Sequence, residues 1–331
     1  MSNQISLTNY SPDVGFNSEL DEKFLYRVIL NLLLIPKIIG KLWSKDAVIT
    51  DKFGPVLWIS TIVGRVLHVP IYVRLRGNPV YEETEHIKYA KQKNKYIMWL
   101  LHGVNYYLLT ITLPLTEAYI LPSEWTKEQL PENNYYIVPT PIRQTTSVSY
   151  SRKSSMNEKN IVCVTNFDFK KKVEPLLYFL EENIDFIEKQ NLNVQILGDG
   201  YLLEETKSKF ADNDNIEFLG FRNDVVDYYK TAGIFLHLSK LDAYPTVVLE
   251  AFFHQVPVIT NAQCGMKEQV EHRKSGLLVN LNNPEIKAAI TEIQTNGALR
   301  EQIIENAFYQ VTTENTIRNV CDEFNTVLSD I

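Results

Sequence analysis

The sequence predicts an α/β fold made of two halves, each with parallel strands that alternate with helices. In the second half, five mostly apolar runs of strand length alternate with helical segments. In the first half, four shorter apolar runs alternate with helical stretches in the same way. Such alternation indicates a parallel sheet covered by helices. With 331 residues, the chain is long enough for two domains of ordinary size.

The composition is that of a globular protein, with 45% hydrophobic and 22% charged residues. A net charge of -7 argues against a dedicated nucleic-acid-binding protein. The three cysteines are far apart and odd in number, so they predict neither a metal-ligand cluster nor a disulfide framework. We therefore expect a reducing, cytoplasmic location.

The first half, residues 1–142, begins with a stretch that has little strand character. Its strands are expected at 47–50, 69–75, 118–121 and 135–138, and its helices include 55–67 and 96–109. Residues 143–160 are polar, rich in serine and threonine and without periodicity, which is typical of an interdomain linker.

The second half, residues 161–311, is more regular and predicts a doubly wound sheet. Its strands are expected at 161–165, 194–197, 216–219, 234–238 and 256–260, and its helices at 173–189, 201–210, 224–230 and 246–254. A further helix is expected at 312–331, packing back toward the first domain. Ligands of this fold bind outside the carboxyl ends of the strands.

Residues 24–43 are the one membrane candidate. The segment carries Arg27, Lys37 and Lys41, and Pro36 interrupts it, which is unsuitable for a spanning helix. As an amphipathic basic helix it could lie on an anionic membrane surface. The alternative, which we favour, is a helix broken near Pro36 that packs on a sheet.

The segment LDAYPTVVLEAFFHQVPVITN carries the strongest functional signal, because it places a carboxylate inside an apolar helix. Seven residues separate Asp242 from Glu250, and Pro245 is expected at the first helical position. Glu250 needs a partner, since an unpaired buried carboxylate is costly. The free N–H groups of Thr246 and Val247 at the helix start favour a phosphate. A phosphate at the helix start and a sugar hydroxyl on Glu250 would together indicate a bound nucleotide. The alternative is that Asp242 complements the helix dipole and Glu250 pairs with a buried Arg or Lys.

Four segments in order resemble one family. They are IVCVTNFDFKKKVEPL, GDGYLLEETKS with NIEFLGFRNDVVDYYKTAGIFLHLS, LSKLDAYPTVVLEAFFHQVPVIT, and CGMKEQVEHRKSGLLVN. Together they resemble the donor-binding domain of a family 4 glycosyltransferase. The resemblance implies a GT-B fold, with two Rossmann-like doubly wound domains that face a cleft. It also implies a retaining sugar transfer from a nucleotide sugar, UDP- or GDP-linked, without a metal or another cofactor.

The resemblance implies a role for each matching residue of the donor site. Asp242 would contact the donor sugar as a catalytic residue, and Glu250 would accept hydrogen bonds from ribose hydroxyls. Lys171 matches the diphosphate lysine, with Lys170 and Lys172 as close rivals. The remaining donor-binding residues are the phosphate-binding Thr246 and Val247, the base-bordering Phe221 and Arg222, and Asn166, Gly198 and Tyr244. For Phe221 the alternative is a place in the core.

Several residues depart from the family pattern. Asp242 stands where a glutamate is usual, and Asn166 stands where an arginine usually contacts the diphosphate. Arg76 stands where a histidine usually lies near the reacting carbon, so we assign it to the catalytic site. Arg74 lies two residues away on the same face, and both arginines either hold an acceptor anion or pair with acids. His102 is another acceptor-side candidate, for which a buried structural role is favoured.

These observations predict a glycosyltransferase with a shortened acceptor-side domain at 1–142 and a donor domain at 161–311. Its partners would be a nucleotide sugar and a glycan, a lipid-linked or a small-molecule acceptor, and no nucleic acid. The alternative is a non-catalytic nucleotide-sugar-binding or scaffold protein. The carboxylates of Asp212 and Asp214 have the spacing of a metal site, but they precede a strand and predict a polar turn.

Overall fold

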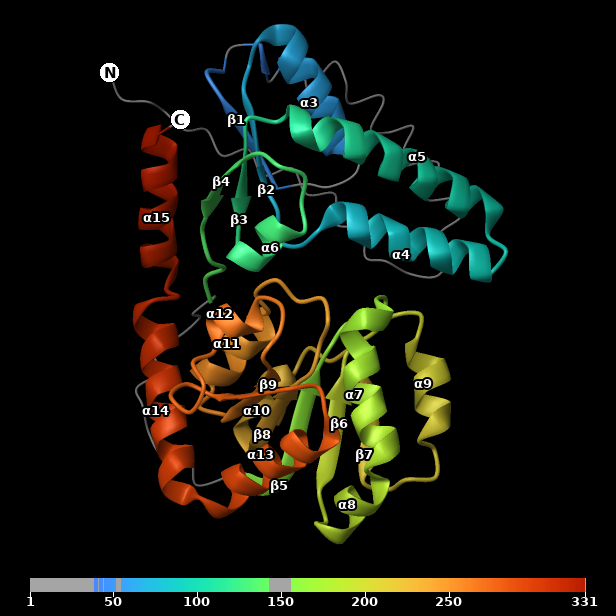
Figure 1. Ribbon diagram of the computed structural model, residues 1–331, viewed down its shortest axis with the longest axis vertical. Coiled ribbons are helices and arrows are strands. Elements are labelled where there is room, and N and C mark those ends of the chain that lie inside the picture. Colours follow the sequence, from blue (N-terminus) through green and yellow to red (C-terminus); the bar gives the residue numbers. More distant parts are fainter. Residues whose placement is uncertain (1–38, 41, 44, 52–54, 143–155, 331) are drawn as a thin grey trace.

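Two parallel sheets, one above the other in Figure 1, form the centres of two domains. They are seen in a computed structural model that describes residues 39–330 apart from 41, 44, 52–54 and 143–155. The predicted segment 24–43 and the linker therefore lie largely outside the described residues. Strand β5 already begins at Asn157, before the expected start of the second domain at Ile161.

The N-terminal sheet confirms the four strands expected in the first half. These are β1 (Val48–Thr50), β2 (Ile71–Arg74), β3 (Ala118–Leu121) and β4 (Asn134–Ile137). They pair in parallel in the order β1-β2-β3-β4. Side chains alternate between the two faces of a strand, so both faces of this sheet need a cover.

Helices cover both faces of the N-terminal sheet. On one face, α3 (Pro55–Leu67) and α5 (Tyr96–Thr112) bring Leu57 and Leu109 against Val73 and Tyr119. The other face is covered by the last helix of the chain, α15 (Ile317–Asp330), which runs beside β4 (Figure 1). Its apolar residues pack on the sheet residues Tyr72, Ala118, Ile120 and Val138.

The structure adds a helix that the sequence analysis did not predict, α4 (Pro79–Gln92). Its start is well specified, because Pro79 occupies the first helical position and the Asn78 side chain accepts a hydrogen bond from the Tyr81 N–H at 3.0 Å. The helix has few apolar residues, so periodicity did not reveal it. It pairs with α5, and a short helix, α6 (Glu124–Glu128), follows β3.

The C-terminal sheet has the doubly wound order β10-β9-β8-β5-β6-β7, all parallel. Its strands are β5 (Asn157–Val164), β6 (Asn193–Leu197), β7 (Ile216–Gly220), β8 (Ala232–His237), β9 (Val258–Asn261) and β10 (Leu277–Val279). The winding reverses between β5 and β8. A crevice for ligands forms at such a switch point, outside the carboxyl ends of the strands.

The helices of this domain follow the expected order with two corrections. The helix expected at 173–189 is two helices, α7 (Lys170–Glu182) and α8 (Ile184–Lys189). They divide at Asn183, whose side chain donates to the Phe179 carbonyl at 2.7 Å and so competes with the helical backbone. The helix expected at 312–331 starts later, at Ile317, as α15. Residues 312 and 313 belong instead to the preceding helix, α14 (Gly297–Thr313).

Three further helices confirm those expected between the strands: α9 (Leu203–Lys209), α10 (Val225–Thr231) and α11 (Thr246–Phe253). The sequence analysis did not predict α12 (Met266–Gln269), α13 (Asn283–Thr295) or the sixth strand, β10. The turn at Asp212–Asp214 joins α9 to the amino end of β7, which is the edge opposite the crevice. There the Asn213 side chain accepts from the Asn215 N–H at 3.0 Å, as expected of a polar turn.

One carboxylate of the C-terminal domain caps a helix of the N-terminal domain. The two oxygens of Glu268, on α12, accept hydrogen bonds from the Glu124 and Trp125 N–H groups at 2.8 and 2.9 Å. These N–H groups open α6, whose own N-cap residue, Ser123, makes no capping bond to them. The contact fixes the two domains relative to one another, because a helix start favours negative charge.

We predict that Glu268→Ala lowers the free energy of unfolding by about 1 kcal/mol, the usual cost of a lost helix cap. Denaturant titration measures the change. Glu271→Ala is the matched control, since Glu271 pairs only with Lys274 on the surface. Equal effects of the two substitutions would contradict an interdomain role for Glu268.

Candidate functional site

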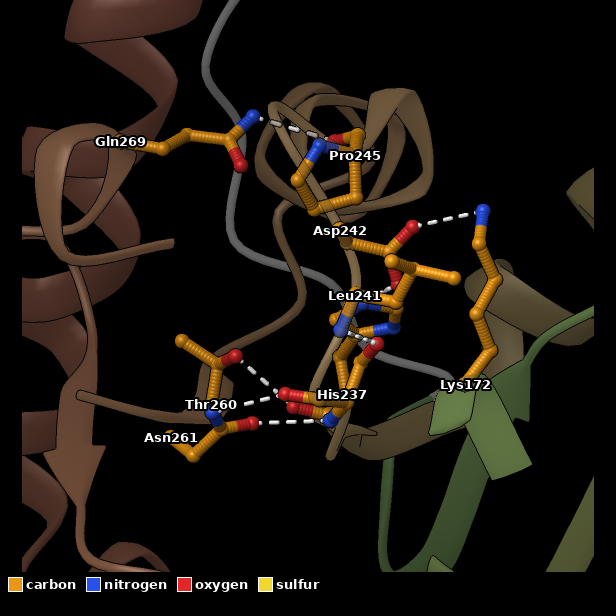
Figure 2. A network of polar contacts seen from close by, with 9 residues as sticks. Lys172, His237, Leu241, Asp242, Pro245, Thr260, Asn261 and Gln269 are labelled. Atoms are coloured by element: carbon orange, nitrogen blue, oxygen red, sulfur yellow. Dashed lines mark hydrogen bonds and ion pairs between the residues drawn. The ribbon is translucent and has the colours of Figure 1, made fainter. Parts of the chain in front are cut away.

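The candidate site centres on Asp242, which lies in the loop after β8 at the switch point. Its carboxylate is buried and lies between two side chains, one from α7 and one from β8 (Figure 2). Lys172, near the start of α7, places Nζ 2.8 Å from Oδ1, and His237 places Nε2 3.1 Å from Oδ2. The site thus joins the loops that follow β5 and β8.

The charges of this cluster stabilise one another. Burial raises the pKa of Asp242, but the Lys172 charge and the His237 hydrogen bond outweigh it and hold that pKa well below its usual range. Burial also lowers the pKa of Lys172, and the carboxylate of Asp242 reverses the effect, so the lysine pKa is raised. A buried ion pair of this kind tolerates the loss of neither partner.

The loop that carries Asp242 is held by polar side chains of β9. The Asn261 amide forms two bonds to Ser239, accepting from its N–H at 2.8 Å and donating to its carbonyl at 2.9 Å. The Thr260 hydroxyl donates to the His237 carbonyl at 2.7 Å (Figure 2). Because these residues are buried, the position of Asp242 is set by the sheet rather than by solvent.

Among the three neighbouring lysines, the structure places Lys172 in the site. Lys170 is exposed at the start of α7. Lys171 is also exposed, and its Nζ lies 4.4 Å from the centre of the Tyr81 ring on α4. The resemblance prefers Lys171 as the diphosphate lysine, and that assignment stays a prediction. The contact with Asp242 is made by its rival Lys172.

Glu250 has a protein donor inside the C-terminal domain. The Tyr229 hydroxyl, from α10, donates to Glu250 Oε2 at 3.2 Å. The alternative to a bound ligand was that Glu250 pairs with a buried Arg or Lys, and Tyr229 is neither. Burial raises the pKa of Glu250, and the tyrosine offsets only part of that effect. The carboxylate is only partly buried, so its second oxygen has room for another donor.

Helix α11 starts at Thr246, as expected of the helix at 246–254. Pro245 is the N-cap residue, with extended backbone, rather than the first helical residue that it was expected to be. The Pro245 carbonyl accepts from the Gln269 amide at 3.1 Å, which keeps the residue outside the helix. Thr246 is exposed and Val247 is partly buried. Their N–H groups belong to the first turn, where a helix leaves donors for an anion.

Gly198 allows the loops after β5 and β6 to approach closely. Its φ is +141°, and a Cβ there would lie 1.8 Å from the Thr165 carbonyl oxygen. A side chain at this position is therefore excluded on two grounds. Asn166, in the neighbouring loop, is exposed and accepts from the Asp168 N–H at 2.6 Å. Both predicted donor-site residues thus line the same sheet edge.

Phe221 and Arg222 follow β7 at that edge. Phe221 is 68% exposed, which excludes the alternative that it belongs to the core. Arg222 forms two hydrogen bonds to Asp224, at 2.9 and 2.7 Å. Tyr244 follows Asp242 in the same loop, and its hydroxyl accepts from the Asn315 amide at 3.0 Å.

Helix α4 brings the N-terminal domain against this edge. Three of its aromatic side chains contact the other domain: Tyr81 meets Lys171, His86 meets Phe169 and Tyr89 stacks on Tyr201. The ring centres of Tyr89 and Tyr201 are 3.8 Å apart. One face of α4 therefore forms a wall of the cleft.

Glu82, on the first turn of α4, is a site residue that the sequence analysis missed. It is partly buried, and its carboxylate interacts electrostatically with Lys172, Glu83 and Asp242. Burial raises its pKa to about 7; the Lys172 charge opposes this, and the acidic neighbours add to it. The Asn78-Pro79 helix start was the sequence signal that could have revealed α4. The position of Glu82 opposite Asp242 depends on the domain arrangement alone.

The acceptor-side candidates lie in separate places. Arg76 follows β2, is exposed, and its guanidinium lies 3.8 Å from Asp51. Arg74 ends β2 under the Phe324 ring, 5.8 Å from its centre. Among the described residues, no contact joins Arg76 to Asp242. The sequence left two roles open for Arg76, binding an acceptor anion or pairing with an acid. In the structure it pairs with an acid.

His102 is buried, as the favoured interpretation expected. Its Nδ1 lies 2.6 Å from Glu83 Oε2 on α4, and its ring stacks on His86. The Asn105 amide donates to the other oxygen of Glu83 at 2.6 Å. This cluster holds α4 and α5 together, so His102 supports the wall of the cleft from behind.

Comparison with known proteins gives one family model and several similar proteins. Residues 149–310 match the family model described as glycosyl transferases group 1. An uncharacterized glycosyltransferase of Haemophilus influenzae is 35% identical over 97 residues, 28% of this chain and 28% of that protein. The Campylobacter jejuni enzyme named GalNAc-α-(1→4)-GalNAc-α-(1→3)-diNAcBac-PP-undecaprenol α-1,4-N-acetyl-D-galactosaminyltransferase is 26% identical over 163 residues, 46% of this chain and 44% of that protein. The chain thus spans less than half the length of these curated relatives.

The structure of Anabaena HepE in complex with UDP and glucose has a similar fold. The TM-score is 0.65 at 15% identity, covering 91% of this chain and 83% of that one. The predicted GT-B fold is therefore confirmed over most of the chain. The segment that matches the glycosyl transferases group 1 model lies in its second half.

We predict that Lys172→Met lowers the free energy of unfolding by about 3 kcal/mol, because it leaves the buried Asp242 carboxylate without its cation. The matched control is Lys171→Met, at an exposed position, which should change stability by less than about 0.5 kcal/mol. Urea titrations of the two variants and the parent provide the comparison. Similar losses in both variants would argue against a stabilising pair.

A second prediction concerns pH. The pKa of Glu82 is raised to about 7 in the folded state, so its contribution to stability is fully present below the unfolded pKa of about 4.5 and declines as pH rises toward 7. Glu82→Gln removes this decline. Thermal unfolding should therefore show that, between pH 4.5 and 7, the stability of the variant rises relative to that of the parent. A stability difference that stays constant over this pH range would disprove the raised pKa of Glu82.

Proposed function

We propose that this protein is a retaining glycosyltransferase that moves a sugar from a nucleotide sugar to an acceptor hydroxyl in glycan or glycoconjugate synthesis. The observation that carries the proposal is the Asp242–Lys172 pair at the switch point, beside the start of α11. The group 1 domain and the UDP-bound HepE structure of the same fold support it. Because the HepE structure contains UDP, we prefer a UDP-linked donor to a GDP-linked one. A cytoplasmic location and independence of metal complete the proposal.

The donor would extend along the carboxyl edge of the C-terminal sheet. Glu250 would accept a hydrogen bond from a ribose hydroxyl through the oxygen that Tyr229 does not use. The Thr246 and Val247 N–H groups and Lys172 would bind the diphosphate. Once the diphosphate engages Lys172, Asp242 would be released to accept a hydrogen bond from the donor sugar. Phe221 and Arg222 would border the base, as the resemblance implies.

In the transfer, the bond between the anomeric carbon and the diphosphate oxygen breaks, and the acceptor oxygen bonds to the same carbon. The electron pair of the broken bond stays on the diphosphate, where Lys172 and the helix start stabilise the new charge. The acceptor proton passes first to a carboxylate on the acceptor side of the cleft and ends on the released diphosphate or in water. Retention means that acceptor and diphosphate occupy the same side of the sugar ring.

Glu82 supplies a group on the acceptor side of the cleft. We assign it to accept a hydrogen bond from the attacking hydroxyl, because it belongs to the N-terminal domain and lies near Asp242. A carboxyl group with a pKa near 7 suits proton transfer at neutral pH. Arg74 and Arg76 lie farther along the same domain and would bind an anionic part of a glycan or lipid-linked acceptor.

The first test is a panel of UDP- and GDP-sugars, followed for nucleotide release with and without a cell-lysate acceptor, with EDTA present in a parallel series. Release that requires both a donor and an acceptor is the expected result. Tight nucleotide-sugar binding without release in any mixture would favour the non-catalytic alternative. Loss of release in EDTA would contradict metal independence.

The diphosphate assignment has its own test. Lys172→Ala should weaken UDP binding about tenfold or more in calorimetry, the loss expected of a charge-assisted hydrogen bond. Lys171→Ala should leave it nearly unchanged. The opposite ranking would return the role to Lys171.

Glu82→Gln separates the acceptor step from donor binding. It should leave the UDP dissociation constant unchanged and lower kcat about 100-fold, within the range of acid–base catalysis. The parent should lose kcat below pH 7, and the variant should lose that dependence. An unchanged pH profile would exclude Glu82 from proton transfer.

A further inference from the structure

Helix α5 has its apolar and polar sides reversed relative to an ordinary surface helix. Its buried side carries His102, Asn105, Leu109 and Thr112. On the opposite side, the side chains of Ile97, Leu100, Val104, Tyr107 and Ile111 are between 45% and 63% exposed. The spacing of these five residues places them on one stripe along the helix.

The inversion has a structural cause. Glu83 of α4 occupies the buried side, accepting from the Asn105 amide and lying 2.6 Å from His102 Nδ1. The polar side of α5 is therefore committed to α4, and the apolar side faces outward. In Figure 1 the two helices form an antiparallel pair that projects from the N-terminal domain. Single exposed apolar side chains are common, but a continuous stripe marks an interaction surface.

The charge around the stripe indicates what it contacts. Residues 86–116 contain four lysines and no acidic residue, although the whole chain has a net charge of -7. Lys91, in the last turn of α4, and Lys93, just after that helix, are exposed. Exposed Tyr96 and Trp99 follow them on the first turn of the helix. Here lysines and aromatic residues lie next to an aliphatic stripe. This combination is typical of a helix that lies in the headgroup region of a bilayer.

We propose that the outer face of α5 docks on an anionic phospholipid membrane, with the helix parallel to the surface and Lys91 and Lys93 contacting the headgroups. None of the helices in the described part of the chain is long and apolar enough to cross a membrane. The contact is therefore interfacial. It lies on a different segment from residues 24–43, and it does not depend on the proposed sugar transfer.

The test is cosedimentation of the full chain with vesicles of phosphatidylcholine, alone or with phosphatidylglycerol. Binding only to the anionic vesicles, and its weakening by salt, are expected. The double variant Leu100→Ser/Val104→Ser should reduce partitioning about tenfold. Lys91→Gln/Lys93→Gln should reduce it about fivefold for each charge removed. The matched controls are Tyr309→Ser on α14 and Lys207→Gln/Lys209→Gln on α9, which should bind as the parent does.

Three results would overturn the proposal. Unchanged binding of the α5 variants would transfer the contact to another segment, with 24–43 the first to be tested. A dimer in sedimentation velocity without vesicles, dissociated by Leu100→Ser/Val104→Ser, would assign the stripe to a second copy. A clear fall in thermal stability of that variant without lipid would show that the chain itself covers the stripe.

Discussion

The buried ion pair between Lys172 and Asp242 is the interaction on which the candidate site depends. Neither charge could remain in this position alone, because burial without a partner is costly for each of them. The pair joins the loops that follow β5 and β8, the two strands between which the winding of the sheet reverses. Asn261 and Thr260 of β9 then hold the loop in place. The fold thus concentrates charge where its geometry leaves a crevice.

The same pair also acts on the carboxyl group of Glu82. Burial raises the pKa of Glu82 to about 7, and the opposing effect of the Lys172 charge offsets only part of this rise. Two carboxyl groups in one cleft therefore have different protonation states. This is the usual arrangement where one group stabilises charge and another transfers a proton. In this chain the two groups come from different domains, so their relation depends on the domain arrangement that Glu268 supports.

The α4–α5 hairpin connects the two surfaces of functional interest. Its inner helix, α4, supplies the wall of the cleft through Tyr81, His86 and Tyr89. Its outer helix, α5, presents the aliphatic stripe to the surroundings. The polar cluster around Glu83 holds these helices together. A membrane contact on the outside would therefore bring the acceptor side of the cleft close to a lipid surface.

The sequence by itself determined the α/β class, the strands and helices whose apolar periodicity is strong, and the carboxylates of Asp242 and Glu250 around a helix start. These features are local, and backbone geometry translates them directly into structure. Only the tertiary structure decided that Lys172 rather than Lys171 reaches Asp242, that Tyr229 partners Glu250, and that Glu82 faces the site. Each of these contacts joins elements far apart in the chain. Their side chains meet only when strand order, helix rotation and domain arrangement are set together, and no local pattern contains that information.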